Sequence, residues 1–201
     1  MRCMALWIVA LAATACGTSN GKTAPEDAAA PADACSTTTS ADFIYPAGPY
    51  GTGVGDRFQD LSLPDCDGQS VRFAEVLAGA DLVLFNVAAG WCAPCIAETQ
   101  TLEVDVYRAF CGRGLRVVQV LFEDENGAPA APEFCGRWRD RFGLTFPVLM
   151  DKDFVTKALF PGTISGSTPL NLLVDRDAVI RYRSAGPTPP DFHQRIEELL
   201  P

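Results

Sequence analysis

Two cysteines separated by two residues, Cys92 and Cys95, form the pair in this sequence best placed to do chemistry. Residues 81–88 before them are nearly all apolar, as in a strand buried on both faces, and the residues after them to about Phe110 have helical spacing. The first turn of a helix presents unpaired N–H groups and the positive end of the helix dipole, which favour an anion. We therefore expect the Cys92 thiol to have a lowered pKa and to attack a partner's disulfide, and Cys95 to resolve the mixed disulfide.

Two other interpretations of this pair are a structural disulfide and half of a metal site. Zinc needs four converging ligands, usually supplied as two closely spaced pairs. Here only Cys92 and Cys95 are closely spaced, and the single histidine, His193, lies far along the chain. The sequence therefore predicts no metal site, and we expect no cofactor.

The first sixteen residues have the pattern of a targeting segment. Arg2 precedes an apolar run over residues 4–13, which has the length of a signal-peptide core and is too short to span a bilayer. Small residues then lead to Cys16 and Gly17, and this resembles a bacterial lipobox, whose cysteine is lipidated. An ordinary cleaved signal peptide, with Cys16 incidental, is the alternative. Both interpretations export the protein, and the lipobox predicts a membrane-anchored bacterial lipoprotein facing the periplasm or the cell exterior.

Residues 17–48 are dominated by Ala, Thr, Ser, Pro, Gly and Asp. A segment of this composition cannot bury enough apolar surface to offset the entropy of ordering it. We expect a disordered tether here, and Cys35 within it is either a staple to the domain or a free thiol. The folded domain is predicted to occupy residues 50–201.

From residue 50 onward, strand-like apolar runs alternate with segments of helical spacing. This order predicts an α/β sandwich with a mixed sheet. The predicted strands are 58–63, 70–73, 81–88, 115–122, 146–150, 170–174 and 179–183, and the predicted helices are 73–77, the segment from the cysteine pair to Phe110, 132–142 and 191–200.

The run Trp91-Cys92-Ala93-Pro94-Cys95 resembles the W-C-x-P-C signature of the thioredoxin superfamily. Over most of residues 50–200 the chain is most similar to the exported TlpA-like and ResA-like thiol–disulfide oxidoreductases, with their redoxin or AhpC-TSA-like domain. The resemblance implies a thioredoxin-like fold, a mixed central β-sheet flanked by helices, with an N-terminal β-hairpin extension supplied by residues 58–73. It also implies an enzyme that reduces disulfides of exported proteins through a redox-active Cys92–Cys95 disulfide and draws electrons from an upstream membrane donor. The residues themselves leave disulfide donation open as the alternative, because the direction of electron flow depends on the reduction potential.

The resemblance extends to three places outside the cysteine pair. Asn86 stands where cytoplasmic thioredoxins carry a buried aspartate; the alternative is a core polar group with a backbone partner. Glu98 matches an acidic residue near the active site of ResA-like proteins, where it would exchange protons with Cys95; a solvated glutamate is the alternative. Thr168-Pro169 matches the cis-proline loop, which would present the Thr168 backbone to an incoming peptide; a trans proline starting a strand is the alternative.

Two neighbours of the cysteines complete the expected substrate-binding set. Trp91 would shield the disulfide and contact partners, unless it only packs in the core. Pro94 fits the first helical turn, where its missing N–H costs little. One position departs from the family, because Gln100 stands where a kinking proline is common, and we expect a straighter helix as a result.

The chain has eight cysteines, which a cytosolic protein would keep reduced and an exported protein could pair. Cys35, Cys66, Cys111 and Cys135 allow three pairings, and we expect structural roles for them. In the implied fold Cys111 and Cys135 lie at opposite ends of the sheet, so a bond between those two is not expected. His193, on the last helix, is expected to be a surface residue.

A net charge of −9 and a pI near 4.5 argue against a nucleic-acid partner and against binding to anionic lipid headgroups. The main alternative function is a thiol peroxidase of the peroxiredoxin or glutathione-peroxidase type. Peroxiredoxins, however, place a threonine three residues before the reactive cysteine, where this chain has Ala89. Copper handling by two thiolates is a further class, and no methionine or histidine cluster supports it.

Overall fold

The structure is built on a five-stranded mixed sheet. The computed structural model describes Cys35, residues 43–160 and residues 167–201. The strand order is β5-β4-β3-β6-β7, where the strands are β3 (Leu82–Ala88), β4 (Leu115–Leu121), β5 (Val148–Met150), β6 (Leu170–Asp175) and β7 (Ile180–Ala185). β3, β4 and β5 run parallel, whereas β6 and β7 are each antiparallel to the strand before them in this order. All seven residues of β3 and of β4 are buried, which explains their nearly continuous apolar sequence.

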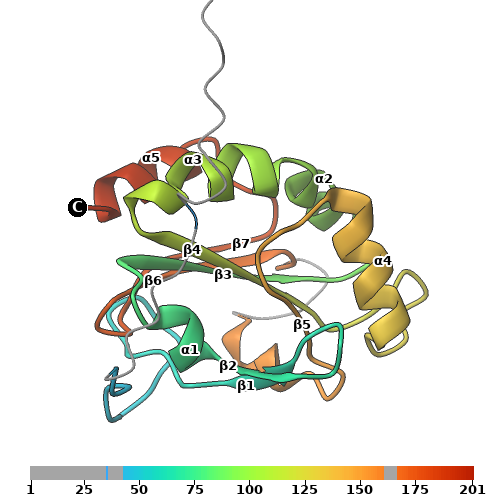
Figure 1. The fold of residues 1–201 in the computed structure, drawn as a ribbon, viewed down its shortest axis with the longest axis horizontal. Coiled ribbons are helices and arrows are strands. Elements are labelled where there is room, and N and C mark those ends of the chain that lie inside the picture. The colour runs from blue at the N-terminus through green and yellow to red at the C-terminus, as the bar shows by residue number, and fades with distance from the viewer. Residues whose placement is uncertain (1–34, 36–42, 161–166) are drawn as a thin grey trace, which may run out of the picture.

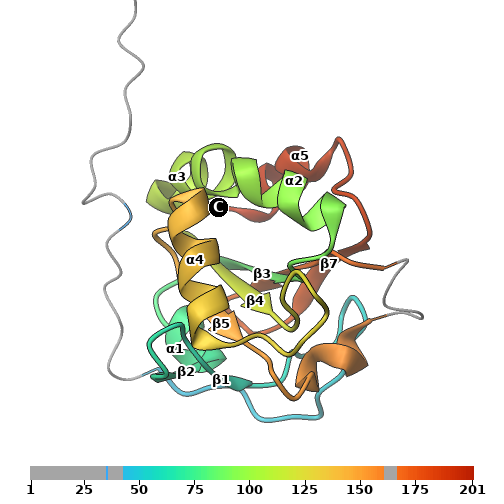
Figure 2. The same ribbon diagram turned by 90° about the vertical axis from the view of Figure 1, so that its right-hand side faces the viewer.

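Helices cover both faces of this sheet (Figures 1 and 2). The helix after the cysteine pair and α5 (Phe192–Leu199) lie over one face, and α1 (Phe73–Leu77) lies over the other with the hairpin of β1 (Ser62–Pro64) and β2 (Ser70–Arg72). α4 (Pro132–Phe142) packs against β5 at the edge of the sheet, and a short helix, η4 (Val155–Leu159), follows β5 in the chain. The predicted thioredoxin-like fold with an N-terminal hairpin is confirmed.

The helix after the cysteine pair is irregular. It begins as α2 (Ala93–Thr101), continues through a π-helical segment, η2 (Leu102–Tyr107), and α3 (Arg108–Phe110), and closes with a 3-10 turn, η3 (Cys111–Arg113). Gly114 then ends it with a φ of 95°, a left-handed conformation that glycine adopts without a Cβ clash. Gln100 itself lies in the regular α2, and the π-helical segment begins two residues later, so the straighter helix expected from Gln100 stays a prediction.

The folded domain begins before residue 50. Phe43 and Tyr45 pack on the core, and the Tyr45 hydroxyl donates a hydrogen bond to the Phe58 carbonyl at 2.8 Å. The last residues of the predicted tether are therefore part of the domain. The predicted signal peptide, its lipidation site Cys16 and most of the tether lie outside the described residues. Within the described part of the chain, no helix is both long and apolar enough to cross a membrane.

Disulfides join six of the cysteines in three pairs: Cys35–Cys111, Cys66–Cys135 and Cys92–Cys95. Cys35 is therefore a staple to the domain and not a free thiol. It is attached at η3, the end of the active-site helix far from the Cys92–Cys95 pair. Cys111 and Cys135 each have another partner, in agreement with the expectation that they do not pair with each other.

Candidate active site

The Cys92–Cys95 disulfide lies at the start of α2, just after the end of β3. Cys92 is the residue that caps the helix, and its sulfur accepts a hydrogen bond from the backbone N–H of Cys95 at 3.2 Å. Pro94 lies in the first turn, as predicted, where no backbone donor is needed. Cys95 is fully buried, whereas Cys92 keeps 3% of its surface exposed. An approaching reagent therefore reaches Cys92 before Cys95.

Trp91 lies beside the disulfide with its side chain partly in solvent, at 38% exposure. Its indole N–H donates to the Glu123 carboxylate at 2.6 Å, and its ring meets Phe122 edge-on at 6.2 Å between centroids. Simple core packing does not describe this residue. A fixed, partly exposed indole on the residue before Cys92 is suited to contact a partner protein.

The Thr168–Pro169 peptide bond is cis, as the sequence comparison with the superfamily implied. Thr168 and Pro169 are buried, and β6 starts directly after them. Leu170, the first residue of β6, pairs with Val87 near the end of β3, five residues before Cys92. The cis-proline loop and the disulfide therefore lie at the same end of the sheet.

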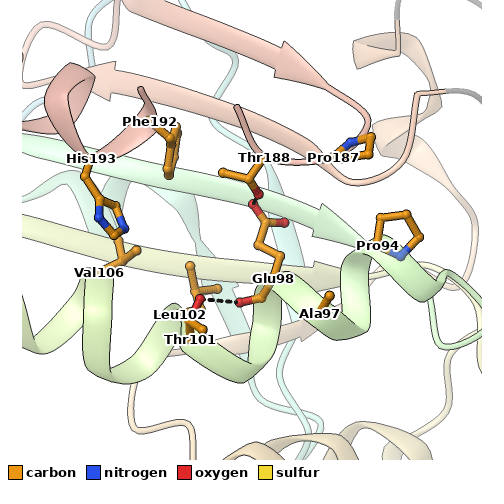
Figure 3. Close-up of a pocket in the computed structure, with 10 residues that line it drawn as sticks. All are labelled: Pro94, Ala97, Glu98, Thr101, Leu102, Val106, Pro187, Thr188, Phe192 and His193. Carbon is orange, nitrogen blue, oxygen red and sulfur yellow. Dashed lines mark hydrogen bonds between the residues drawn. The ribbon is translucent and has the colours of Figure 1, made fainter. Parts of the chain in front are cut away.

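A cavity of about 290 Å³ opens beside α2, between this helix and α5 (Figure 3). It is lined mainly by apolar groups, and its two titratable lining residues are Glu98 and His193. His193 is exposed, as expected, and its ring lies 6.2 Å from that of Phe110. Within the described residues, no group of three His, Cys, Asp or Glu side chains is arranged to hold a metal ion.

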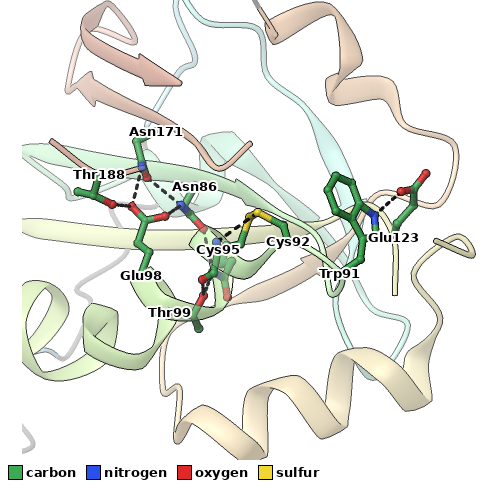
Figure 4. The surroundings of a disulfide bond; sticks show 10 residues. Asn86, Trp91, Cys92, Cys95, Glu98, Thr99, Glu123, Asn171 and Thr188 are labelled. Atoms are coloured by element: carbon green, nitrogen blue, oxygen red, sulfur yellow. Dashed lines mark hydrogen bonds between the residues drawn. A yellow bond between two sulfur atoms is a disulfide. The ribbon is translucent and has the colours of Figure 1, made fainter. Parts of the chain in front are cut away.

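Glu98 is held by three donors (Figure 4). Its Oε1 accepts hydrogen bonds from Asn171 Nδ2 at 2.6 Å and from the Thr188 hydroxyl at 2.5 Å, and its Oε2 accepts from Asn86 Nδ2 at 3.0 Å. Burial raises the pKa of Glu98 above its ordinary value, and the hydrogen bonds from Thr188, Asn171 and Asn86 only partly oppose this effect. The solvated glutamate considered from the sequence is therefore not what the structure contains. Asn86 likewise bonds to side chains, not only to a backbone partner.

Several residues of this site were not identified from the sequence. They are Thr99, Gln119, Glu123, Trp138, Asn171 and Thr188. Two of them did leave a signal, because Gln119 and Asn171 are isolated amides inside otherwise largely apolar strands, as Asn86 is. A buried amide needs hydrogen-bond partners, so each such residue indicates a polar contact inside the fold.

We expect Glu98→Gln to change how stability depends on pH. The ordinary pKa of this carboxyl group, which applies to the unfolded chain, is 4.5. A raised pKa in the folded protein means that folded Glu98 keeps its proton over a pH range in which unfolded Glu98 has already lost it. The folded state then binds more protons, so the wild-type free energy of unfolding falls as pH rises through this range and levels off above the folded pKa. The free energy of unfolding of the variant lacks this decline, so the stability of the variant relative to the wild type increases as pH rises.

Urea unfolding of the oxidised proteins at closely spaced pH values measures this difference. Exposed Glu197 on α5 supplies the matched control, and Glu197→Gln should follow the wild-type profile. Parallel profiles for the wild type and Glu98→Gln would contradict the prediction.

Cys92 and Cys95 begin a helix at the same end of a thioredoxin-like sheet as a cis-proline loop, and this arrangement defines the class: the protein is a thiol–disulfide oxidoreductase. The sequence profile of the AhpC/TSA family matches residues 54–183, and the chain belongs to this family.

Similar proteins include a thiol–disulfide oxidoreductase and a protein with a peroxiredoxin name. ResA, a thiol-disulfide oxidoreductase of Geobacillus thermodenitrificans, is 27% identical over 150 residues, which cover 74% of this chain and 79% of ResA. A protein of Mycobacterium tuberculosis with a provisional peroxiredoxin name is 30% identical over 135 residues, covering 63% of this chain and 80% of that protein. A crystal structure from Chlorobium tepidum, provisionally named as the thiol:disulfide interchange protein DsbE, superposes with a TM-score of 0.62 at 22% identity. It covers 75% of this chain and 100% of its own, and it supports the fold.

Proposed function

We propose that this protein reduces disulfides of exported proteins, with Cys92 as the nucleophile and Cys95 as the resolving cysteine. The observation that carries the assignment is the asymmetry of the pair. Cys92 is the member of the pair that keeps some surface exposed, and it caps the helix. Its sulfur accepts a hydrogen bond from a backbone N–H group that would stabilise a thiolate. Cys95 is fully buried one turn further on, where it can reach the Cys92 sulfur of a mixed disulfide but not a partner's disulfide directly.

The reaction moves two electrons. The Cys92 thiolate attacks one sulfur of the partner's disulfide, that bond breaks, and the partner's second sulfur leaves as a thiolate. The Cys95 thiolate then attacks the Cys92 sulfur, which closes the Cys92–Cys95 disulfide and releases the partner's other thiolate. The partner is reduced and takes up two protons, and this protein is oxidised. A dithiol donor at the membrane would restore the reduced pair by the reverse exchange.

Glu98 would handle the proton that Cys95 must lose before it attacks. Its raised pKa keeps the carboxyl group able to gain and release a proton closer to neutral pH than an exposed glutamate. Trp91, Pro94 and the backbone of Thr168 would form the surface on which the partner's extended chain lies.

An extracytoplasmic location fits the cysteine chemistry. Two disulfides besides the Cys92–Cys95 pair persist only where the surroundings are oxidising. The signal-peptide pattern of residues 1–16 supports export, and the lipobox at Cys16 supports a lipid anchor in a bacterial membrane. Radiolabelled fatty acid incorporated into the wild type and not into Cys16→Ala would establish this anchor.

The decisive experiment is capture of a substrate on the reduced protein. Cys95→Ser should accumulate a mixed disulfide through Cys92 with a disulfide-containing protein such as insulin, because no resolving thiol remains. Cys92→Ser is the matched control and should capture nothing, since Cys95 is buried. Mass spectrometry of the adduct identifies the linked cysteine. Failure of Cys95→Ser to form an adduct through Cys92 would overturn the proposal.

The mycobacterial relative with a peroxiredoxin name makes peroxide the second candidate substrate. The Cys92 thiolate would attack hydrogen peroxide, giving a sulfenic acid and hydroxide, and the Cys95 thiol would then displace the sulfenic oxygen as water to close the disulfide. The residue at position 89, alanine and not threonine, disfavours this chemistry in the present chain. Side-by-side rates with insulin and with hydrogen peroxide decide between the two substrates.

A further inference from the structure

Three amide side chains form a row across the centre of the sheet. Gln119 on β4, Asn86 on β3 and Asn171 on β6 are cross-strand partners, and all three are fully buried. Gln119 Nε2 donates to Asn86 Oδ1 at 2.8 Å, and Asn86 Nδ2 donates to Asn171 Oδ1 at 2.8 Å. The row ends at the Glu98 carboxylate, which accepts from both asparagines.

Two groups outside the row fix the direction in which Gln119 points. The indole of Trp138, on α4, can only donate, and it does so to Gln119 Oε1 at 2.8 Å. The Thr99 hydroxyl donates its one hydrogen bond to the Cys95 carbonyl at 2.8 Å. Toward Gln119 the Thr99 oxygen can therefore only accept, and it accepts from Gln119 Nε2 at 2.9 Å. Both constraints turn the Gln119 oxygen toward Trp138 and its NH₂ group toward Asn86.

The orientation of the Gln119 amide determines the orientations of the two asparagine amides in the row. Because Gln119 presents N–H groups, Asn86 must present its oxygen to Gln119 and its own NH₂ group to Glu98 and Asn171. Asn171 consequently accepts with its oxygen and donates to Glu98 with its nitrogen. Both asparagines therefore present N–H groups to the carboxylate, which is the arrangement that favours its ionised form.

We propose that Trp138 and Gln119 are positioning residues of the thiol–disulfide site, which orient Asn86 so that the Glu98 carboxylate meets amide N–H groups and not an amide oxygen. The same Gln119 NH₂ group also supports Thr99 and, through it, the turn that carries Cys95. The role of these residues in catalysis rests on the proposed function, but the orientation itself does not.

The other titratable groups around Glu98 come from two elements. His193 on α5 lines the same cavity, and Cys95 lies one turn earlier on α2. The partners on β3, β6 and the segment before α5 are the neutral side chains of Asn86, Asn171 and Thr188. A measurement on the oxidised protein removes the thiols from the titration, and a His193→Gln background removes the imidazole.

The experiment follows the Glu98 carboxyl carbon by ¹³C NMR as a function of pH in the oxidised protein, with Glu98→Gln to assign the signal. In Trp138→Phe the Gln119 amide keeps only the constraint from Thr99 and its oxygen has lost its donor, so the amide can turn, and Asn86 can then point its oxygen at Glu98. The titration midpoint should rise by about half a pH unit to one pH unit. Phe142→Leu is the matched control, because it alters a ring 4.7 Å from Trp138 on the same helix and keeps the indole N–H. The control should leave the midpoint in place.

A second pair of variants tests the route. Gln119→Met should raise the midpoint at least as far as Trp138→Phe, and adding Trp138→Phe to Gln119→Met should raise it no further, because the indole acts only through Gln119. If Trp138→Phe does not fold, benzothienylalanine at position 138 keeps the shape of the indole and replaces its N–H by sulfur.

An unchanged midpoint without the indole N–H, an equal rise in Phe142→Leu, or additive rises in the double variant would each overturn the proposal. These outcomes are distinct from failure of the proposed function, which would show as the absence of substrate capture through Cys92.

Discussion

Replacing Cys66 and Cys135 together by alanine is expected to lower the free energy of unfolding by about 3–5 kcal/mol. The disulfide closes a loop with a sequence separation of 69 residues, so its removal returns much conformational freedom to the unfolded chain. It is also part of the core, since Cys66 is 7% exposed and Cys135 fully buried, and both sulfurs lie 3.7 Å from the Val148 carbonyl oxygen on β5. Urea unfolding under non-reducing conditions measures the loss.

The Cys35→Ala/Cys111→Ala double variant is the matched control. It removes the same number of cysteines and a loop of similar sequence separation, 76 residues, so the loop-closure contribution is nearly the same. Cys35, however, is only partly buried, and we expect the smaller loss from this pair. A Cys66→Ala/Cys135→Ala protein as stable as the wild type would show that the bond contributes nothing to folding.

Most of the fold could be predicted from the sequence because the central strands are buried on both faces of the sheet. β3 and β4 carry continuous apolar runs because helices cover them on both sides, and these runs predicted the strands to within one residue at each end. α1 and α4 were predicted over the same residues that the structure shows. The order of these elements was sufficient to predict the fold class.

One predicted strand was misplaced for a physical reason. The alternation over residues 58–63 predicted a strand, but β1 covers only Ser62–Pro64. Phe58 is fully buried because its ring packs against Phe73 at 4.7 Å and Phe85 at 4.9 Å, not because it belongs to a strand. The apolar residues Phe58 and Leu63 are indeed buried, but they would lie on opposite faces of a single strand, so the alternation did not report which backbone groups pair.

The cysteine pair, Glu98 and the cis-proline loop could be predicted because local spacing and family resemblance mark them. The row of amides could not, since its members lie 33 and 85 residues apart from Asn86 and meet only through strand register. The same limit applies to the pairing of Cys66 with Cys135. Contacts of this kind are consequences of the whole fold, and a single sequence carries only the hint that a buried polar group needs a partner.

The active-site loop also depends on a residue with no side chain. A Cβ added at Gly90 would lie 2.6 Å from the Asp124 carbonyl carbon and 2.6 Å from the Glu125 backbone nitrogen. These backbone atoms cannot easily move aside, because the Asp124 side chain accepts hydrogen bonds from the N–H groups of Asn126 and Ala128 and fixes the turn. Alanine at position 90 must therefore displace either this turn or the segment that leads to Cys92.

We expect Gly90→Ala to lower the free energy of unfolding by about 2–3 kcal/mol, as overpacking in a rigid site does. It should also slow insulin reduction by about tenfold to a hundredfold, because the displaced loop carries Cys92 and the Trp91 indole that bonds to Glu123. Gly136→Ala is the matched control, since it lies inside α4 and its added Cβ would meet nothing within 4 Å beyond its chain neighbours and the helix's own backbone. Alanine there should stabilise the helix by about 1 kcal/mol and leave the reduction rate unchanged. If Gly90→Ala matched this control in stability and rate, the close approach of the two loops would not constrain the active site.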